Sequence, residues 1–124
     1  MPILLVALGG AAGAVSRFVL DTFVTERLGG AFPFGTLVIN VSGSFAIGLL
    51  FALAIERSLL PAAIRGPAMI GFIGAYTTFS TLMLETWRLA EDGAVALSIV
   101  NLVGSALLGM LAVVAGLAVG RAWA

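Results

Sequence analysis

Long apolar stretches separated by short polar segments are the main pattern along this chain. Four stretches contain no charged residue, and each is bounded by glycine, proline or charged side chains. A helix needs about 20 apolar residues to cross the roughly 30 Å of hydrocarbon in a bilayer. Extended to its turn signals, each stretch reaches that length. The pattern predicts four membrane-spanning helices, over residues 3–22, 34–55, 63–90 and 95–119.

The segments that connect these helices are short. Residues 25–33, 56–61 and 91–93 contain the Gly, Pro and charged side chains that are typical of turns. They leave no room for a soluble domain, so we expect a single four-helix transmembrane domain over residues 1–124. The first stretch lacks the basic segment with which a signal peptide begins, and this favours a first membrane helix over a cleaved signal.

The composition agrees with a membrane protein and excludes most enzyme chemistry. Apolar residues make up 61% of the chain, charged residues 10%, and the mean hydropathy is +1.20, whereas soluble domains carry about 25% charged residues. Cys, His and Lys are absent, which excludes disulfides, thiol nucleophiles, imidazole bases and Schiff-base chemistry. The net charge is zero, so there is no basic patch for nucleic acid. We expect an integral membrane protein that is not an enzyme.

The arginines predict no preferred orientation in the membrane. With four spans, the two termini and the second connection share one side. Arg57, Arg65 and Arg121 lie on that side, and Arg17, Arg27 and Arg88 lie on the other. Cytoplasmic segments usually carry an excess of Arg and Lys. The even count has two explanations. The rule is noisy for a short chain, or the chain inserts in both orientations. In the second case two copies would pair antiparallel and so supply the inverted symmetry of many transporters.

Small residues four positions apart favour close association of helices. The pairs are Gly9 with Gly13, Gly10 with Ala14, and Gly116 with Gly120. Such spacing lets backbones approach where lipid offers no hydrophobic driving force, although glycine is common in membrane helices in general.

Polar side chains inside the spans mark candidate sites, because such groups are costly in lipid. The second span carries Thr36, Asn40 and Ser44 on one helix face, and the fourth carries Asn101 and Ser105 at the same spacing. Hydrogen bonds between helices explain such rows without a ligand. We favour that interpretation for the fourth span.

The third predicted helix should be interrupted near its centre, between Gly74 and Thr77. Residues 71–81 read G-F-I-G-A-Y-T-T-F-S-T, in which two glycines precede an aromatic and two β-branched residues, all poor helix formers. A continuous helix over residues 63–90 would be roughly 42 Å long, so the interruption falls at the bilayer midplane. Transporters and channels expose backbone carbonyls and helix ends to ions at such places.

The side chains around the interruption suit a small anion slightly better than a cation. Freed carbonyls attract cations, whereas the hydroxyls of the T-T-F-S-T segment can donate hydrogen bonds to an anion. No Arg lies mid-span, and Glu85 is the only acid in a mid-helix position. Hydroxyls, an amide and the positive edges of aromatic rings together suit fluoride, the smallest halide. The residues alone place anion permeation only slightly ahead of cation transport.

Two of these segments resemble the signatures of the Fluc/CrcB fluoride channels. Residues 35–40, G-T-L-V-I-N, resemble the family's G-T-L-x-x-N, and residues 71–81 resemble its G-F-x-G-x-x-T-T-F-S-T. Arg17 resembles the arginine of the family's first helix, and Glu85 with Thr86 matches the E-T that often follows the second signature. The length and the pattern of spans are similar along the whole chain.

The resemblance implies an all-α, dual-topology antiparallel homodimer in the prokaryotic cell membrane, with two pores that let fluoride leave the cytoplasm passively and so lower its toxicity. It also implies a structural sodium ion at the dimer centre, held by the backbone carbonyls of Gly74 and Thr77. The residues that it assigns to the fluoride pathway are Asn40, Phe79, Ser80, Thr81, Thr36 and Ser105. Arg17 and Glu85 fall at a gate or vestibule.

Two positions depart from the family pattern. Leu82 stands where a second Phe is usual, so one ring edge is missing from the lining. Ala75 stands where Gly is common, and its methyl group tightens the interruption.

A small multidrug-type cation exporter is the nearest alternative of this size. Such exporters need an acid in the middle of the first helix, whereas here Asp21 lies at the end of that span. A holin-like or structural subunit would not need a polar interruption at the midplane. An intramembrane enzyme would lack its bases, and Glu85 has no partner acid.

Overall fold

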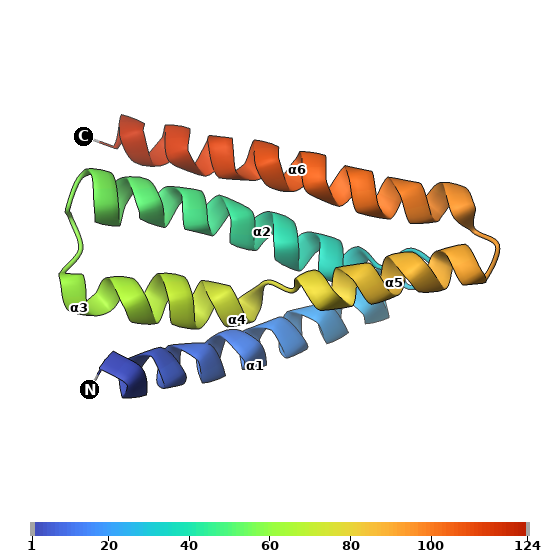
Figure 1. Ribbon diagram of the computed structural model, residues 1–124, viewed down its shortest axis with the longest axis horizontal. Helices are drawn as coiled ribbons and strands as arrows, with labels where there is room; N and C mark the ends of the chain where they lie inside the picture. Colours follow the sequence, from blue (N-terminus) through green and yellow to red (C-terminus); the bar gives the residue numbers. More distant parts are fainter. Residues whose placement is uncertain (1, 124) are drawn as a thin grey trace.

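The chain forms a bundle of long helical segments, in which α1 begins and α6 ends at the same end of the bundle (Figure 1). The computed structural model describes residues 2–123, and these residues form helices and connections but no strand. The elements are α1 (Pro2–Leu28), α2 (Phe34–Leu50), η1 (Phe51–Glu56), α3 (Ala62–Arg65), η2 (Gly66–Ile73), α4 (Gly74–Tyr76), α5 (Phe79–Glu91) and α6 (Val95–Ala122). The backbone of η1 and η2 has the wider winding of a π-helix.

Four helical segments are long and apolar enough to cross a membrane, which confirms the predicted number of spans. They are Pro2–Leu28, Phe34–Glu56, Ala62–Glu91 and Val95–Ala122. The first is longer than predicted, because the charged residues that follow residue 20 continue the helix instead of ending it. It ends where Gly29 and Gly30 adopt positive φ angles of 52° and 79°, which glycine tolerates without steric cost.

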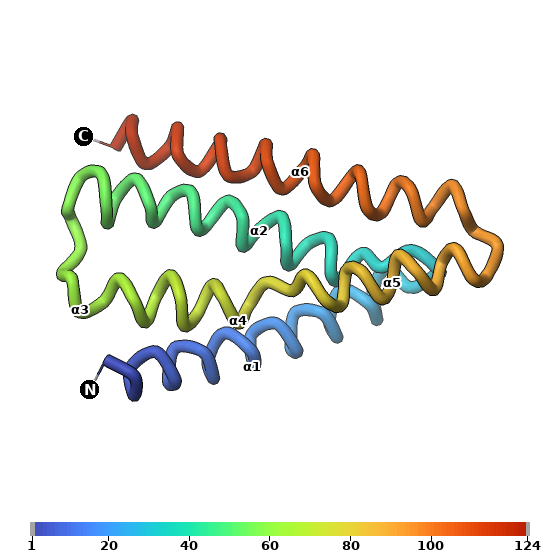
Figure 2. The backbone as a smooth tube through the Cα atoms, viewed as in Figure 1, coloured from blue at the N-terminus to red at the C-terminus, as the bar shows by residue number. Residues whose placement is uncertain are grey.

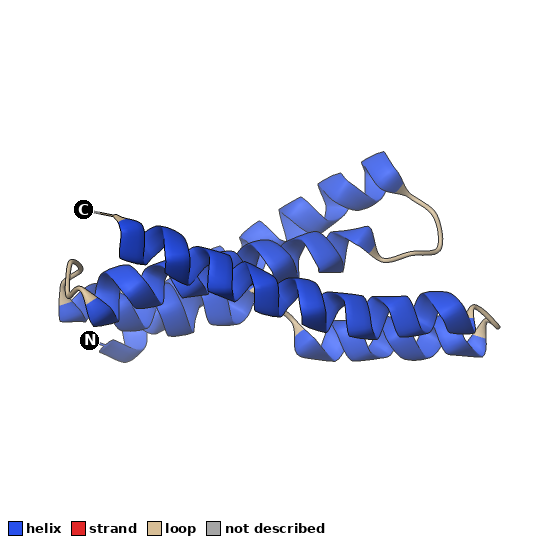
Figure 3. Ribbon diagram, turned by 90° about the horizontal axis from the view of Figure 1, so that it is seen from above, coloured by secondary structure: helices blue, strands red, loops and turns tan. Residues whose placement is uncertain are grey.

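Apart from α5 and α6, the helices pack mainly against elements that do not follow them directly in the chain. α2 packs mainly against α6, α1 packs mainly against η2 and α4, and α5 packs against α6 (Figure 2). Seen from above, the tip formed by α1 and α2 diverges from the tip formed by α5 and α6 (Figure 3). The bundle is therefore forked at the end opposite the chain termini.

Glycines form the seams between these helices. A Cβ on Gly13 would collide with the carbonyl oxygen of Phe72, and a Cβ on Gly116 would collide with the carbonyl oxygen of Phe45. Backbone thus lies directly on backbone, the close approach that small residues allow in membranes. Both seams lie within one chain, so the small-residue pairs account for the packing of the bundle itself and leave the pairing of two copies open.

The surface of the bundle is apolar. Ile3 is 86% exposed and Phe18 is 72% exposed, whereas Ile39 and the side chain of Asn101 are fully buried. Outward apolar side chains suit a hydrocarbon solvent, in which a helical bundle satisfies its backbone internally. The chain is a multi-pass membrane protein.

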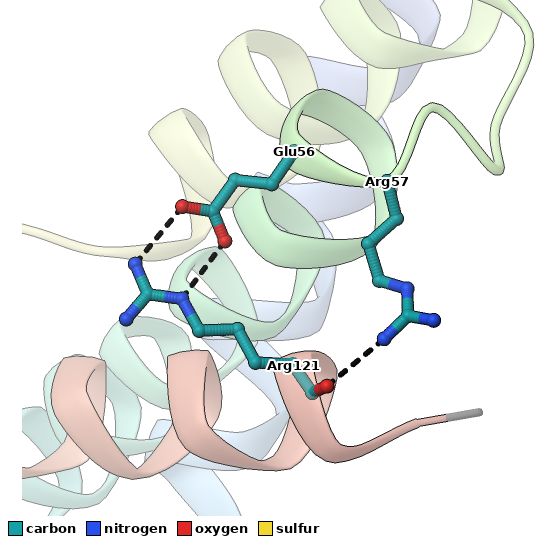
Figure 4. A network of polar contacts seen from close by, with 3 residues as sticks. All are labelled: Glu56, Arg57 and Arg121. Atoms are coloured by element: carbon teal, nitrogen blue, oxygen red, sulfur yellow. Dashed lines mark hydrogen bonds and ion pairs between the residues drawn. The ribbon is translucent and has the colours of Figure 1, made fainter.

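An ion pair joins the second and fourth spans at the end that holds the chain termini. Arg121 donates from Nε and Nη2 to the two carboxylate oxygens of Glu56, each at 2.9 Å (Figure 4). Arg57 donates from Nη1 to the backbone oxygen of Arg121, also at 2.9 Å. The bond from Arg57 caps the last turn of α6, where orphan carbonyls need partners. All three side chains are solvent-accessible, so solvent weakens the pair.

Replacing Gly13 by Ala should destabilise the bundle, because the new Cβ would meet the Phe72 carbonyl. We expect the free energy of unfolding in detergent micelles to fall by about 1–3 kcal/mol. Gly10→Ala is the matched control, since its Cβ would lie 3.7 Å from the Gly71 oxygen, at ordinary contact distance. Equal stabilities of the two variants would show that α1 and η2 do not pack this closely.

Candidate functional site

The third span is interrupted by two extended residues. α4 ends at Tyr76 and α5 begins at Phe79, while Thr77 (φ −82°, ψ 157°) and Thr78 (φ −146°, ψ 115°) have extended backbones. The sequence places the interruption between Gly74 and Thr77, and here the structure corrects it. Gly74 remains helical (φ −60°, ψ −37°), and the backbone leaves the helix only at the two β-branched residues, which favour extended conformations.

Asn40 on α2 satisfies the backbone at the interruption. Its Nδ2 donates to the carbonyl oxygen of Thr78 at 3.0 Å, and its Oδ1 accepts from the amide of Thr78 at 2.8 Å. The Thr78 side chain in turn accepts from the amide of Thr81 at 3.2 Å, as the N-cap of α5. A side-chain amide thus replaces the two backbone partners that a continuous helix would supply.

These bonds release the two carbonyl groups assigned to the sodium ion. In a continuous helix the amide of Thr78 would donate to Gly74, and the amide of Thr81 would donate to Thr77. Both amides donate elsewhere, to Asn40 and to the Thr78 hydroxyl. The carbonyl groups of Gly74 and Thr77 are therefore without helical partners, which is the state that a carbonyl ligand of a cation requires.

Two further contacts hold α4 in place beside the interruption. Arg17 on α1 donates from Nε to the carbonyl oxygen of Ala75 at 3.2 Å, so it caps the end of α4. On the other side the hydroxyl groups of Ser42 and Tyr76 form a hydrogen bond of 2.8 Å. The sequence indicated neither contact, because each joins segments far apart in the chain.

A groove of about 530 Å³ runs along the interruption between α2, the third span and α6. Of the predicted site residues, those that line it are Asn40, Gly74, Thr77, Phe79 and Ser105, together with Leu82. The Phe79 ring is 74% exposed. Thr36, Ser80, Thr81, Arg17 and Glu85 lie outside this lining. The structure thus brings together the amide, one aromatic ring and the free carbonyls.

A buried polar row joins α5 to α6. Asn101 donates from Nδ2 to the Thr86 hydroxyl at 2.9 Å, and the Ser98 hydroxyl donates to the Thr86 carbonyl at 2.7 Å. These bonds confirm hydrogen bonding between helices as one role of the polar row on the fourth span. They leave Asn101 Oδ1 and the Ser105 hydroxyl buried without a partner among the described residues. The sequence did not predict the contact of Ser98 or the role of Thr86. The only indication was that each of the two helices beside the short connection after Glu91 carries a polar residue.

Glu85 lies near the other end of the site. Its carboxyl group lies beside the buried Thr36 hydroxyl, and its Oε1 has no hydrogen-bond partner among the described residues. Asp21 is within electrostatic reach of the same group, and its own carboxylate lies against Gly35 at the beginning of α2. The expectation that Glu85 has no partner acid stays a prediction, because Asp21 acts on it only through its charge and accepts its hydrogen bond from Thr25.

Replacing Asn40 by Ala should expose the backbone of the interruption. Each lost bond leaves a buried polar group unpaired, at a cost of about 1–3 kcal/mol, so hydrogen exchange at the Thr78 amide should accelerate by at least about tenfold. Ser42→Ala is the control, because it removes a bond of the same helix to Tyr76 without touching Thr78. Unchanged exchange at Thr78 in the Asn40 variant would mean that another group holds this segment.

Comparisons with known proteins agree with this arrangement. The model of the family described as "CrcB-like protein, Camphor Resistance (CrcB)" matches residues 4–117. A protein of Magnetococcus marinus named "Fluoride-specific ion channel FluC" is 50% identical over 121 residues, 98% of this chain and 98% of the relative. Proteins of the same name from Acidobacterium capsulatum (46% identical, 98% of this chain and 97% of the relative) and Solibacter usitatus (44%, 91% and 93%) are also similar.

The family match covers nearly the whole chain, and these relatives are far above 30% identity along nearly their entire lengths. On these grounds, the chain belongs to the CrcB-like family.

Proposed function

We propose that this protein is a fluoride-selective channel that lets fluoride leave the cytoplasm passively and so lowers its toxicity. The observation that carries the proposal is the interruption in the third span, where Asn40, the extended pair and Phe79 line one groove. These groups are uncharged, so they offer hydrogen bonds without the strong field that would trap an ion. The relatives named as fluoride channels support the same substrate.

The fluoride pathway consists of donors and one ring edge. Its residues are Asn40, Phe79, Ser80, Thr81, Thr36 and Ser105. Asn40 has a second Nδ2 hydrogen beyond the one given to Thr78, and the unpartnered Ser105 hydroxyl is free to donate. The exposed edge of Phe79 carries the positive lobe of its quadrupole. Fluoride is a strong hydrogen-bond acceptor, so the hydrogen bonds from these donors replace those that it loses when it leaves water. Arg17, which caps α4, and Glu85 serve a gate or vestibule on either side.

Two copies in antiparallel arrangement form the channel. One chain forms only one wall of the pore, because its groove is open on one side and Phe79 in that groove is 74% exposed. The end that holds the chain termini carries three arginines and one acid, whereas acids outnumber arginines at the forked end. In an antiparallel pair each basic end lies beside the partner's acidic end, so the charges attract.

A structural sodium ion at the centre of the dimer accounts for the free carbonyl groups. Gly74 and Thr77 would hold it with their backbone oxygens, and two chains would together supply four such ligands. Neutral carbonyl ligands suit a monovalent cation and are too weak to dehydrate Mg²⁺. The ion neutralises the carbonyl dipoles at the interface; it is not transported.

Fluoride efflux from liposomes, followed with a fluoride electrode, tests the function, and Phe79→Ile tests the pathway. We expect selective efflux of fluoride over chloride by the unaltered protein, and a loss of at least about tenfold in Phe79→Ile, which removes the ring quadrupole. Phe18→Ile is the matched control, because Phe18 is similarly exposed, at 72%, but lies on α1 outside the groove. A cation exporter would instead move a cationic dye against a proton gradient and pass no fluoride.

Replacing sodium by a large organic cation on both sides of the membrane tests the ion assignment. Efflux should fall progressively as the bound ion dissociates, and it should return when sodium is restored. Potassium in place of sodium serves as a control for ionic strength. Efflux that continues at full rate without sodium would refute the sodium site while leaving the fluoride pathway intact.

A further inference from the structure

Gly43 on α2 lies directly against the extended segment of the third span. A Cβ at this position would overlap Cγ2 of Thr77 and would lie 3.2 Å from Cδ2 of Tyr76. Both Gly43 and Thr77 line the groove. The missing side chain of Gly43 therefore leaves a notch that receives the methyl group of Thr77, one of the two residues whose carbonyl groups lack helical partners.

Neither neighbour of this notch is free to retreat by rotating its side chain. The Thr77 hydroxyl donates to the carbonyl oxygen of Ile73 at 3.0 Å, so a rotation about χ1 that moved Cγ2 would break that bond. The Tyr76 hydroxyl is bonded at 2.8 Å to that of Ser42, which precedes Gly43 on α2. A larger residue at position 43 would therefore push the backbone of the extended segment away from α2.

The other contacts of Thr77 leave its carbonyl group as the part that is free to take a ligand. The Thr77 amide donates to Ile73 at 3.0 Å, as the hydroxyl does. Asn40 holds the amide and the carbonyl group of the next residue, Thr78. With the methyl group seated at Gly43, the extended backbone is fixed from both sides, and so is the place of the Thr77 carbonyl oxygen.

We propose that Gly43 is a positioning residue for the sodium site, because its notch sets how far the Thr77 carbonyl oxygen reaches toward the centre of the dimer. The inference rests on the proposed function, in which the carbonyl groups of Gly74 and Thr77 from two copies hold the ion. The size of a cage of carbonyl oxygens contributes to the choice among monovalent cations. Gly43 thereby favours sodium over the larger potassium ion.

The test measures the thermal unfolding temperature of the purified protein in detergent, at fixed protein concentration, as sodium replaces a large organic cation. An ion that binds only the folded protein stabilises it, so the rise with sodium concentration gives an apparent dissociation constant without any measurement of fluoride flux. Gly43→Ala should raise this constant at least about tenfold and should reduce the preference for sodium over potassium.

Gly109→Ala is the matched control. Gly109 also lines the groove, but a Cβ there would lie 3.5 Å from the Ser44 hydroxyl oxygen, at ordinary contact distance. The new methyl group would fill part of the groove without moving the extended segment. The sodium constant of this variant should therefore stay within about twofold of that of the unaltered protein.

Thr77→Ser supplies a rescue that a general loss of stability would not give. It removes Cγ2 but keeps the hydroxyl that bonds to Ile73, so the methyl group introduced by Gly43→Ala would occupy the vacated space. The double variant should bind sodium within about threefold of the unaltered protein. Thr77→Ser combined with Gly109→Ala should show no gain over Thr77→Ser alone.

The role of Gly43 is refuted by an unchanged sodium constant in Gly43→Ala, by an equal change in Gly109→Ala, or by no recovery in the double variant. If Gly43→Ala does not fold, the double variant decides, since it should fold and bind sodium normally. Absence of any sodium effect on the unaltered protein would refute this role together with the sodium assignment. Fluoride efflux, which this measurement does not use, decides the proposed function separately.

Discussion

The pairing of Asn40 with the backbone of Thr78 is the interaction on which the rest of the site depends. In a bilayer, water cannot satisfy a broken helix, and each unpaired backbone group costs several kcal/mol. One side-chain amide supplies both the donor and the acceptor that Thr78 needs. The two extended residues are therefore stable inside the bundle, and the span is divided into two helices whose ends face each other at the centre.

Opposite helix ends give the centre of the bundle two electrostatic characters, and the one arginine beside them, Arg17, is bonded to a carbonyl oxygen of α4. The beginning of α5 presents unpaired amide hydrogens and carries no acid in its first turn, so it favours an anion. The end of α4 presents carbonyl oxygens, one of which is already capped by Arg17, so its uncapped neighbours favour a cation. A single interruption thus places a helix end that favours an anion beside a helix end that favours a cation.

Local sequence signals predicted the spans and the neighbourhood of the interruption, but not the partners that hold it. Four apolar stretches located the helices, because length and hydropathy decide which segments cross a membrane. The exact interruption was misplaced, since glycine at position 74 is tolerated in a packed helix and the decisive bonds come from Asn40, 38 residues before Thr78. Asp21 was expected at the end of a span, whereas α1 continues for seven residues beyond it to Leu28. Contacts of this kind depend on how the helices pack.

The buried polar groups that lack partners follow the proposed route of the ion. Glu85 Oε1, Asn101 Oδ1 and the Ser105 hydroxyl are unpaired among the described residues, whereas buried polar groups in proteins are nearly always bonded. Glu85 lines a pocket between the connection over residues 29–33 and the second half of α5, and Ser105 lines the groove. Two of the three groups therefore lie where water or an ion can supply the missing bond. A channel has to keep such groups free, because a pathway whose donors were all bonded to the protein would offer a dehydrating ion nothing in exchange for its water.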